Sequence, residues 1–332
     1  MSKNLRITCR SRWAVLARLG LAGSLAAAVL AQAPVDAAGV LEVDNACDRS
    51  ISKIEAPAGT TVLLVGPAVH TCIPTFDPVT GALLTGNGIT VDAEGVTLDL
   101  NGRSIHSASD VLTDARAVNP SLSVTSTGVS LRGKNNRIVN SSPLPSLVDN
   151  FTGNFEVRAQ DSAIVGTLTD AGYNLVGGNA HGGAALTVLA SLRVTIDTLQ
   201  LQDMGANGGT GLEVRRSESI TLRNSRIEGL FTGARVRDSK LVSLLGNPYV
   251  SGHQGAGAEV RTSEGTTISG NVVADNQVDG VRVAGDTKST AVTNDTIQNN
   301  GGCGIRVVPT AQSYVIAPNV FFNNASADVC IK

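Results

Sequence analysis

Charged side chains recur at a nearly constant spacing in the second half of the sequence. One series, Glu213, Arg235, Glu259 and Arg282, advances in steps of 22 to 24 residues, and arginines also stand two residues after its first three members. Arginine forks bind carboxylates through paired hydrogen bonds, and two carboxyl groups that face one substrate can hydrolyse a glycosidic bond. Either chemistry requires a fold that brings successive repeats side by side.

Apolar positions recur with the same period and predict that fold. The steps shorten from 33 residues early in the chain to between 22 and 26 later, along Val91, Val124, Val157, Val188, Val214, Val236, Val260, Val283, Val307 and Ile331. Two further series keep step with the first: Ile196, Leu222, Leu244, Ile268, Val292 and Ile316, and then Leu201, Ile227, Tyr249, Val273, Ile297 and Phe321.

Each repeat holds three short stretches in which apolar and polar residues alternate, which indicates three strands with one buried face. A unit of this size cannot bury that face alone and must stack on its neighbours. Strands one repeat apart then pair in parallel, and parallel connections are right-handed. We therefore predict an all-β protein, a right-handed parallel β-helix solenoid of about ten coils with an N-terminal cap.

The turns between the stretches favour the same architecture, because asparagine tolerates the left-handed backbone of tight corners. Asparagines recur between the second and third stretches at Asn224, Asn247, Asn271, Asn294 and Asn319, and after the third at Asn276, Asn300 and Asn324. A leucine-rich repeat would need a leucine consensus that this sequence lacks.

The motif Gly-Val-Thr-Leu-Asp-Leu-Asn-Gly-Arg-Ser-Ile at 95–105 and the Asn-x-x-x-Gly-Val/Ile-x-Val coils from Asn276 onward resemble the bacterial parallel β-helix repeat family of the pectin-lyase-like superfamily. The resemblance covers about residues 88–332. It implies the fold, and it implies that the first sheet is the working face, since enzymes of the superfamily generally act there. It implies no particular activity, because the repeat motif records stacking and turn geometry.

The N-terminal segment 1–37 has the layout of a secretory signal peptide, with basic residues before an apolar stretch at 19–33. An uncleaved membrane anchor is the alternative. We expect a secreted or periplasmic protein with no membrane contact after cleavage. Removing the segment leaves 21 basic and 27 acidic side chains, a net charge of about −6. Such a balance argues against nucleic acid as a partner.

Four cysteines remain after signal removal, an even number suited to an oxidising compartment. Three connectivities are open, and the nearest-neighbour choice joins Cys47 to Cys72 and Cys303 to Cys330. If Cys330 stays in register it stacks over Arg306, which places the Cα atoms of Cys303 and Cys330 roughly 11 Å apart, beyond the reach of a disulfide. Either the last strand leaves its register or that bond does not form.

Three segments follow from this reading: the signal at 1–37, a capping segment at 38–87 and the solenoid at 88–332. The capping segment should cover the first coil so that its edge is not open. The C-terminal edge has less to cover it and could meet a partner there.

The outward face of the first sheet is the candidate site. With Val214 and its equivalents inside, one outward lane contains Glu156, Thr187, Glu213, Arg235, Glu259, Arg282 and Arg306, and the other contains Arg158, Leu189, Arg215, Arg237 and Arg261. Coils are about 4.8 Å apart, so these side chains form a ladder with an excess of arginine. The functional interpretation is a groove for an anionic polysaccharide such as a uronic-acid chain; the structural one is ion pairing that keeps an exposed sheet soluble.

Two enzymatic chemistries and one non-enzymatic role fit such a groove. Glu213 and Glu259 lie roughly 9.6 Å apart at Cα, near the separation of an inverting glycosidase pair, but Arg235 between them should hold both ionised. A lyase would use the arginines to neutralise a uronate and His181 as its base, and we favour it over hydrolysis. We expect no metal or other cofactor, since no acidic cluster resembles a calcium site. The alternative is a non-catalytic surface, adhesion or envelope protein.

Overall fold

The computed structural model describes residues 39–77, 79–80, 82–108, 125–170, 172–178, 180, 183–203, 209–247 and 249–331, which all lie in one compact unit that spans residues 37–332. This part of the chain is built from β-strands and contains no helix. Accordingly, none of its segments is a helix with the length and apolar character needed to cross a membrane.

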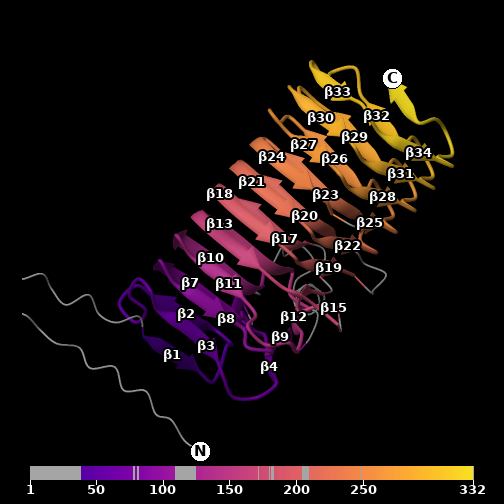
Figure 1. The fold of residues 1–332 in the computed structure, drawn as a ribbon. Coiled ribbons are helices and arrows are strands. Elements are labelled where there is room, and N and C mark those ends of the chain that lie inside the picture. The colour runs from indigo at the N-terminus through magenta and orange to yellow at the C-terminus, as the bar shows by residue number, and fades with distance from the viewer. Residues whose placement is uncertain are drawn as a thin grey trace, which may run out of the picture. The chain divides into compact units, whose positions relative to one another are not determined.

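Three rows of parallel strands form the sides of the coils (Figure 1). The first sheet contains β2 (Arg49–Ser52), β7 (Ile89–Glu94), β10 (Thr127–Lys134), the start of β13 (Gly153–Val165), β17 (Ala184–Leu189), β20 (Thr210–Arg215), β23 (Thr232–Arg237), β26 (Ala258–Arg261), β29 (Val281–Ala284), β32 (Ile305–Val307) and β35 (Val329–Ile331).

The second sheet contains β1 (Val40–Val43), β3 (Thr61–Leu64), β8 (Thr97–Asp99), β11 (Arg137–Val139), the end of β13, β18 (Leu192–Asp197), β21 (Glu218–Arg223), β24 (Lys240–Leu245), β27 (Thr267–Ser269), β30 (Thr290–Thr293) and β33 (Tyr314–Ile316). The third sheet contains β4 (Val69–Cys72), β9 (Ser104–Ser107), β12 (Ser146–Asp149), β16 (Leu175–Gly177), β19 (Gln200–Gln202), β22 (Arg226–Glu228), β25 (Tyr249–Ser251), β28 (Val272–Ala274), β31 (Thr296–Gln298) and β34 (Val320–Phe322).

Two short antiparallel hairpins project from this frame. One joins β5 (Thr75–Phe76) to β6 (Leu83–Thr85), and the other joins β14 (Leu168–Thr169) to β15 (Gly172–Tyr173). The parallel rows and the single apolar interior confirm the predicted right-handed parallel β-helix.

The interior consists of like residues stacked in columns, because each strand points alternate side chains inward. Val214, Val236 and Val260 pair in direct succession and are completely buried. At two places in the columns the structure has a different residue from the predicted one. Leu131 pairs with both Val91 and Val157, the place assigned to Val124, which lies outside the described residues.

In the third column Val250, and not Tyr249, pairs with Ile227 and with Val273. Tyr249 points outward, where its ring lies 5.2 Å from the Arg226 guanidinium carbon. The reason is one additional residue in this coil: Ile227 and Val250 are 23 residues apart, whereas the pairs in the first two columns, such as Leu222 and Leu244, are 22 apart.

The N-terminal segment contributes a coil of its own. Strands β2, β3 and β4, within the segment 38–87 that we expected to be a cap, pair in parallel with β7, β8 and β9. Strand β1 then covers β3, and Ile51 and Val62 are completely buried. At the other end Ile331, in the same column as Ile51, remains 60% exposed.

Both disulfides of the nearest-neighbour pairing are present, Cys47–Cys72 and Cys303–Cys330. The predicted separation of roughly 11 Å between Cys303 and Cys330 was wrong. Strand β35 stays in register, with Cys330 beside Arg306, and yet the two cysteine Cα atoms are 6.0 Å apart. Cys303 lies in the turn before β32 and not in extended chain, so the turn brings it close to Cys330.

Candidate functional site

The two outward lanes of the first sheet exist as the sequence predicted. Register pairs Glu213 with Arg235, Arg235 with Glu259, and Glu259 with Arg282. In the second lane arginine pairs with arginine, because Arg237 lies between Arg215 and Arg261. Parallel in-register pairing therefore gathers cations from coils far apart in sequence on one face.

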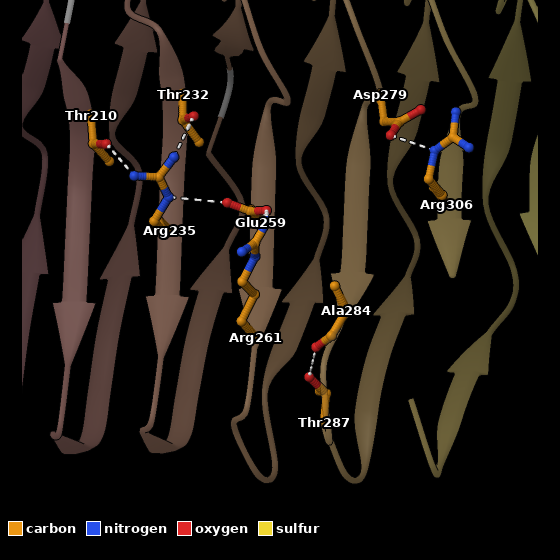
Figure 2. A network of polar contacts seen from close by, with 9 residues as sticks. All are labelled: Thr210, Thr232, Arg235, Glu259, Arg261, Asp279, Ala284, Thr287 and Arg306. Carbon is orange, nitrogen blue, oxygen red and sulfur yellow. Dashed lines mark hydrogen bonds and ion pairs between the residues drawn. The ribbon is translucent and has the colours of Figure 1, made fainter. Parts of the chain in front are cut away.

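Arg235 is the best-anchored cation of the face (Figure 2). Its Nε donates to Glu259 Oε2 at 3.0 Å, while its two terminal nitrogens donate to the hydroxyls of Thr210 at 3.2 Å and Thr232 at 3.1 Å. These threonines belong to two successive strands, β20 and β23, so stacking of the coils fixes the guanidinium plane. Glu259 also accepts from Arg261 Nε at 2.7 Å, which links the two lanes.

Glu259 is ionised and cannot act readily as a general acid. Its side chain is only 7% exposed, and burial by itself would raise the pKa of the carboxyl. The charges and hydrogen bonds of Arg261 and Arg235 outweigh burial and hold the pKa of Glu259 below its usual range. A general acid needs a raised pKa, so this environment argues against the inverting hydrolysis considered for Glu213 and Glu259.

A hollow of about 240 Å³ opens beside this network. Phe231, Gly255 and Val278 follow one another through main-chain hydrogen bonds, and Gly255 leaves a gap between the two apolar side chains. Phe231 is 51% exposed and Val278 is 42% exposed, so they form an apolar rim. The full lining is Phe231, Thr232, Arg235, Gly255, Ala256, Glu259, Arg261, Val278 and Arg282.

The hollow carries an excess of positive charge, with three guanidinium groups against one carboxylate. Arg282, in the hollow, and Arg237, in the second lane, form no ion pair or side-chain hydrogen bond with any residue that the structure describes. The Nε atoms of both are buried without a partner. On the second sheet, by contrast, Arg223 is paired with Asp197 at 2.7 Å.

The earlier coils of the face are closer to electrical balance. Glu156 pairs with Arg158 at 2.9 Å and approaches Arg132, which the sequence reading left out of the lane, at 3.9 Å. Glu213 lies 3.9 Å from Arg215. For these coils the structural interpretation, ion pairing on an exposed sheet, describes the contacts adequately.

Arg306, the last arginine of the first lane, is bound to a buried carboxylate. Its Nε donates to Asp279 Oδ2 at 2.7 Å, and the other oxygen of Asp279 accepts from the main chain of Cys303 at 3.0 Å. The hydrogen bond from Arg306 to Asp279 raises the pKa of the guanidinium further. Asp279 thus joins the lane to the terminal disulfide.

The candidate base of the lyase reading, His181, lies outside the described residues. Sequence reasoning also missed a histidine–carboxylate pair on the third sheet, where His106 Nδ1 lies 2.7 Å from Asp149 Oδ1. These two residues stand 43 apart in the sequence, so spacing gives no signal for them. Within the described ranges no group of three or more His, Cys, Asp or Glu side chains could hold a metal ion.

Residues 172–331 match the family model described as the right handed beta helix region. No curated protein sequence matches the chain. Among solved structures, a surface adhesin of Streptococcus pneumoniae is 13% identical, with 88% of this chain and 82% of that chain covered and a TM-score of 0.49. The periplasmic alginate epimerase AlgG is 12% identical, with 85% and 73% covered and a TM-score of 0.45.

An exopolygalacturonase of Thermotoga maritima is 9% identical, with 89% of this chain and 84% of that chain covered and a TM-score of 0.47. The three similar structures differ in what they do. At these identities and scores they give no argument about the activity of this chain.

Proposed function

We infer that this chain, a right-handed parallel β-helix protein with a pectin-lyase-like fold, binds an anionic polysaccharide along the outward face of its first sheet. The observation that carries the inference is the hollow beside β26, where unpaired Arg282 and a half-exposed Phe231 meet. Sugar rings pack on aromatic faces, and carboxylates pair with guanidinium forks.

The second lane extends the same surface. The arginines on β20, β23 and β26 repeat at the coil spacing of about 4.8 Å, so an extended chain laid across these three coils would meet one cation per coil. Arg237 forms no ion pair or side-chain hydrogen bond with the described residues, which leaves its terminal nitrogens for a ligand in this lane. Arg235 contributes by holding Glu259 and the threonines in place, since each of its three nitrogens already donates to one of these residues.

We propose that this face binds the polysaccharide, and we assign no catalytic reaction to it. Glu259 is held ionised, and the described residues of the face offer no histidine as a base. We place the protein in an extracytoplasmic compartment, because two disulfides are stable where the surroundings are oxidising. The non-catalytic surface role is compatible with such a binding face.

The test is titration of polygalacturonate and alginate, with neutral dextran as the uncharged comparison, into the purified protein. Arg282→Gln removes the unpaired charge and should weaken binding of the anionic polymers about tenfold, the effect of losing one charge-assisted hydrogen bond. Phe231→Ala should weaken it by a similar factor. Arg223→Gln, on the second sheet, is the matched control and should leave affinity unchanged.

If Arg282→Gln and the wild type bind both polymers with equal affinity, the proposed binding site is wrong. The same titration carries a second readout, since elimination yields unsaturated products that absorb in the ultraviolet. Their appearance would add a lyase activity to the binding site.

A further inference from the structure

Four successive polar side chains form a column at the C-terminal end of the corner between the second and third sheets. Asn247, Asn271, Asp295 and Asn319 stack through hydrogen bonds in which the main-chain N–H of one coil donates to the side chain of the next. The three distances are 3.0, 2.7 and 2.9 Å. The asparagine spacing predicts Asn294 at this corner, but Asp295 occupies the position. The column therefore consists of three amides and one carboxyl group.

The amides of this column also donate to the main chain. Asn271 Nδ2 donates to the carbonyl oxygen of Leu244 at 3.0 Å, and Asn319 Nδ2 donates to that of Val292 at 2.8 Å. Both acceptors lie 27 residues before the donor. The same step from Asp295 leads to Ile268.

Asp295 has an oxygen where its neighbours have a donor. Its Oδ1 accepts from both the main chain and the side chain of Asn271, at 2.7 and 2.9 Å. Its Oδ2 is buried without a hydrogen-bond partner, and the residue is completely inaccessible. In the place that the amide nitrogens of Asn271 and Asn319 occupy, the Oδ2 of an ionised carboxylate would face the Ile268 carbonyl oxygen with no proton between them, which is costly in a buried site.

We propose that Asp295 joins the column as a protonated carboxylic acid, with Oδ2–H donating to the Ile268 carbonyl, and that loss of this proton loosens the C-terminal coils as the pH rises. The proton takes the place of one hydrogen of an asparagine amide. The hydrogen bonds of this corner are then all formed only when Asp295 is protonated.

The electrostatic surroundings support this assignment. Burial raises the pKa of Asp295 to about 6, although the hydrogen bonds from the main chain and the side chain of Asn271 oppose the rise. The strands packed around this corner, β27, β28, β30, β31, β33 and β34, contain no Lys, Arg, His, Asp or Glu, and Tyr314 is their one titratable side chain. No nearby cation is therefore available to favour the carboxylate.

The direction of the pH effect follows from the raised pKa. The unfolded chain holds this proton with a pKa of 3.8 and the native chain with one of about 6. The stabilisation is complete below the unfolded value and is lost as the pH rises through the native one. A difference of about two pKa units corresponds to a change on the order of 100-fold in the equilibrium for opening this corner.

The experiment compares amide hydrogen exchange in β30, β31, β33 and β34 between pH 4 and pH 7.5, corrected for intrinsic exchange. In the wild type, protection should fall on the order of 100-fold across this range. In Asp295→Asn, whose amide is a permanent donor, it should stay level and exceed the wild type at pH 7.5. A protonated-acid carbonyl band that disappears in the Asp295→Asn infrared spectrum at pH 4 would show the proton directly.

Asn247→Asp is the matched control, because it places a second carboxyl group in the same column. Its coils should be as protected as the wild type at pH 4 and less protected at pH 7.5. The proposal fails if Asp295→Asn and the wild type share one pH dependence. It also fails if Asp295→Asn is less protected than the wild type at pH 7.5, or does not fold.

Discussion

Replacing Glu259 by glutamine should weaken the fold and strengthen anion binding at the same time. The carboxylate accepts from Arg235 at 3.0 Å and from Arg261 at 2.7 Å, in a position where only 7% of its side chain is exposed. Hydrogen bonds to charged groups contribute about 1.5–3 kcal/mol each, and glutamine keeps one acceptor oxygen. We therefore expect a loss of about 1–3 kcal/mol in the free energy of unfolding, because Arg235 retains Thr210 and Thr232.

The same substitution raises the excess charge of the hollow by one unit and leaves Arg235 and Arg261 with one shared acceptor oxygen in place of two. Affinity for an anionic polysaccharide should rise by about threefold to tenfold, with a steeper dependence on salt. Thermal unfolding and calorimetric titration measure the two effects on the same sample. Weaker binding by a folded Glu259→Gln protein would refute the reasoning, because it would make the carboxylate part of the binding surface.

The pH dependence of this variant provides a further check. The lowered pKa of Glu259 means that its contribution to stability is present above the unfolded value of 4.5 and is lost as the pH falls through the lower native value. The difference in unfolding temperature between wild type and Glu259→Gln should therefore shrink in acid. A difference that grows in acid would contradict the sign of the shift.

Two other changes probe the scaffold. Gly233→Ala would place a Cβ 2.6 Å from Nε2 of the fully buried His253, so it should lower the free energy of chemical unfolding by more than about 2 kcal/mol. Gly153→Ala is the control, because its Cβ would be 3.6 Å from the nearest atom and should change that free energy little; equal losses would contradict the packing. Replacing Cys303 and Cys330 together by serine removes a cross-link across 27 residues and should destabilise the last coil by about 3 kcal/mol. Amide exchange should become faster in β35 and stay unchanged in the first coils. Exchange in β35 as slow as in the wild type would show that the bond is dispensable.

The sequence predicted the columns well because the alternation of a strand and the period of a coil are both local and repeated. Val214, Val236 and Val260 stand in strands of four to six residues, where inward and outward positions separate cleanly. From those positions the outward lanes, Arg235 and Arg237 among them, follow without further information. The register of the strands confirms the order of residues predicted for the first lane.

The parts that were not predicted depend on the corners. Insertions before β10 displaced the first column, so that Leu131 and not Val124 pairs with Val91. The distance between Cys303 and Cys330 was overestimated because it assumed an extended chain, whereas a turn at Cys303 brings the two residues together. The rim residue Phe231 carries no periodic signal, since its role depends on the absence of a side chain at Gly255, one coil away.

The anchoring of Arg235 by neighbours in adjacent coils bears on how such a chain can change length. Its carboxylate partner is 24 residues later and one of its threonine partners is 25 residues earlier, so each bond crosses one coil boundary. Duplication of one complete coil in frame would preserve every column and extend the cationic surface by one rung. An insertion of any other length inside a strand between Arg235 and one of these partners would move that partner out of register, which confines tolerated growth to whole coils or to the turns.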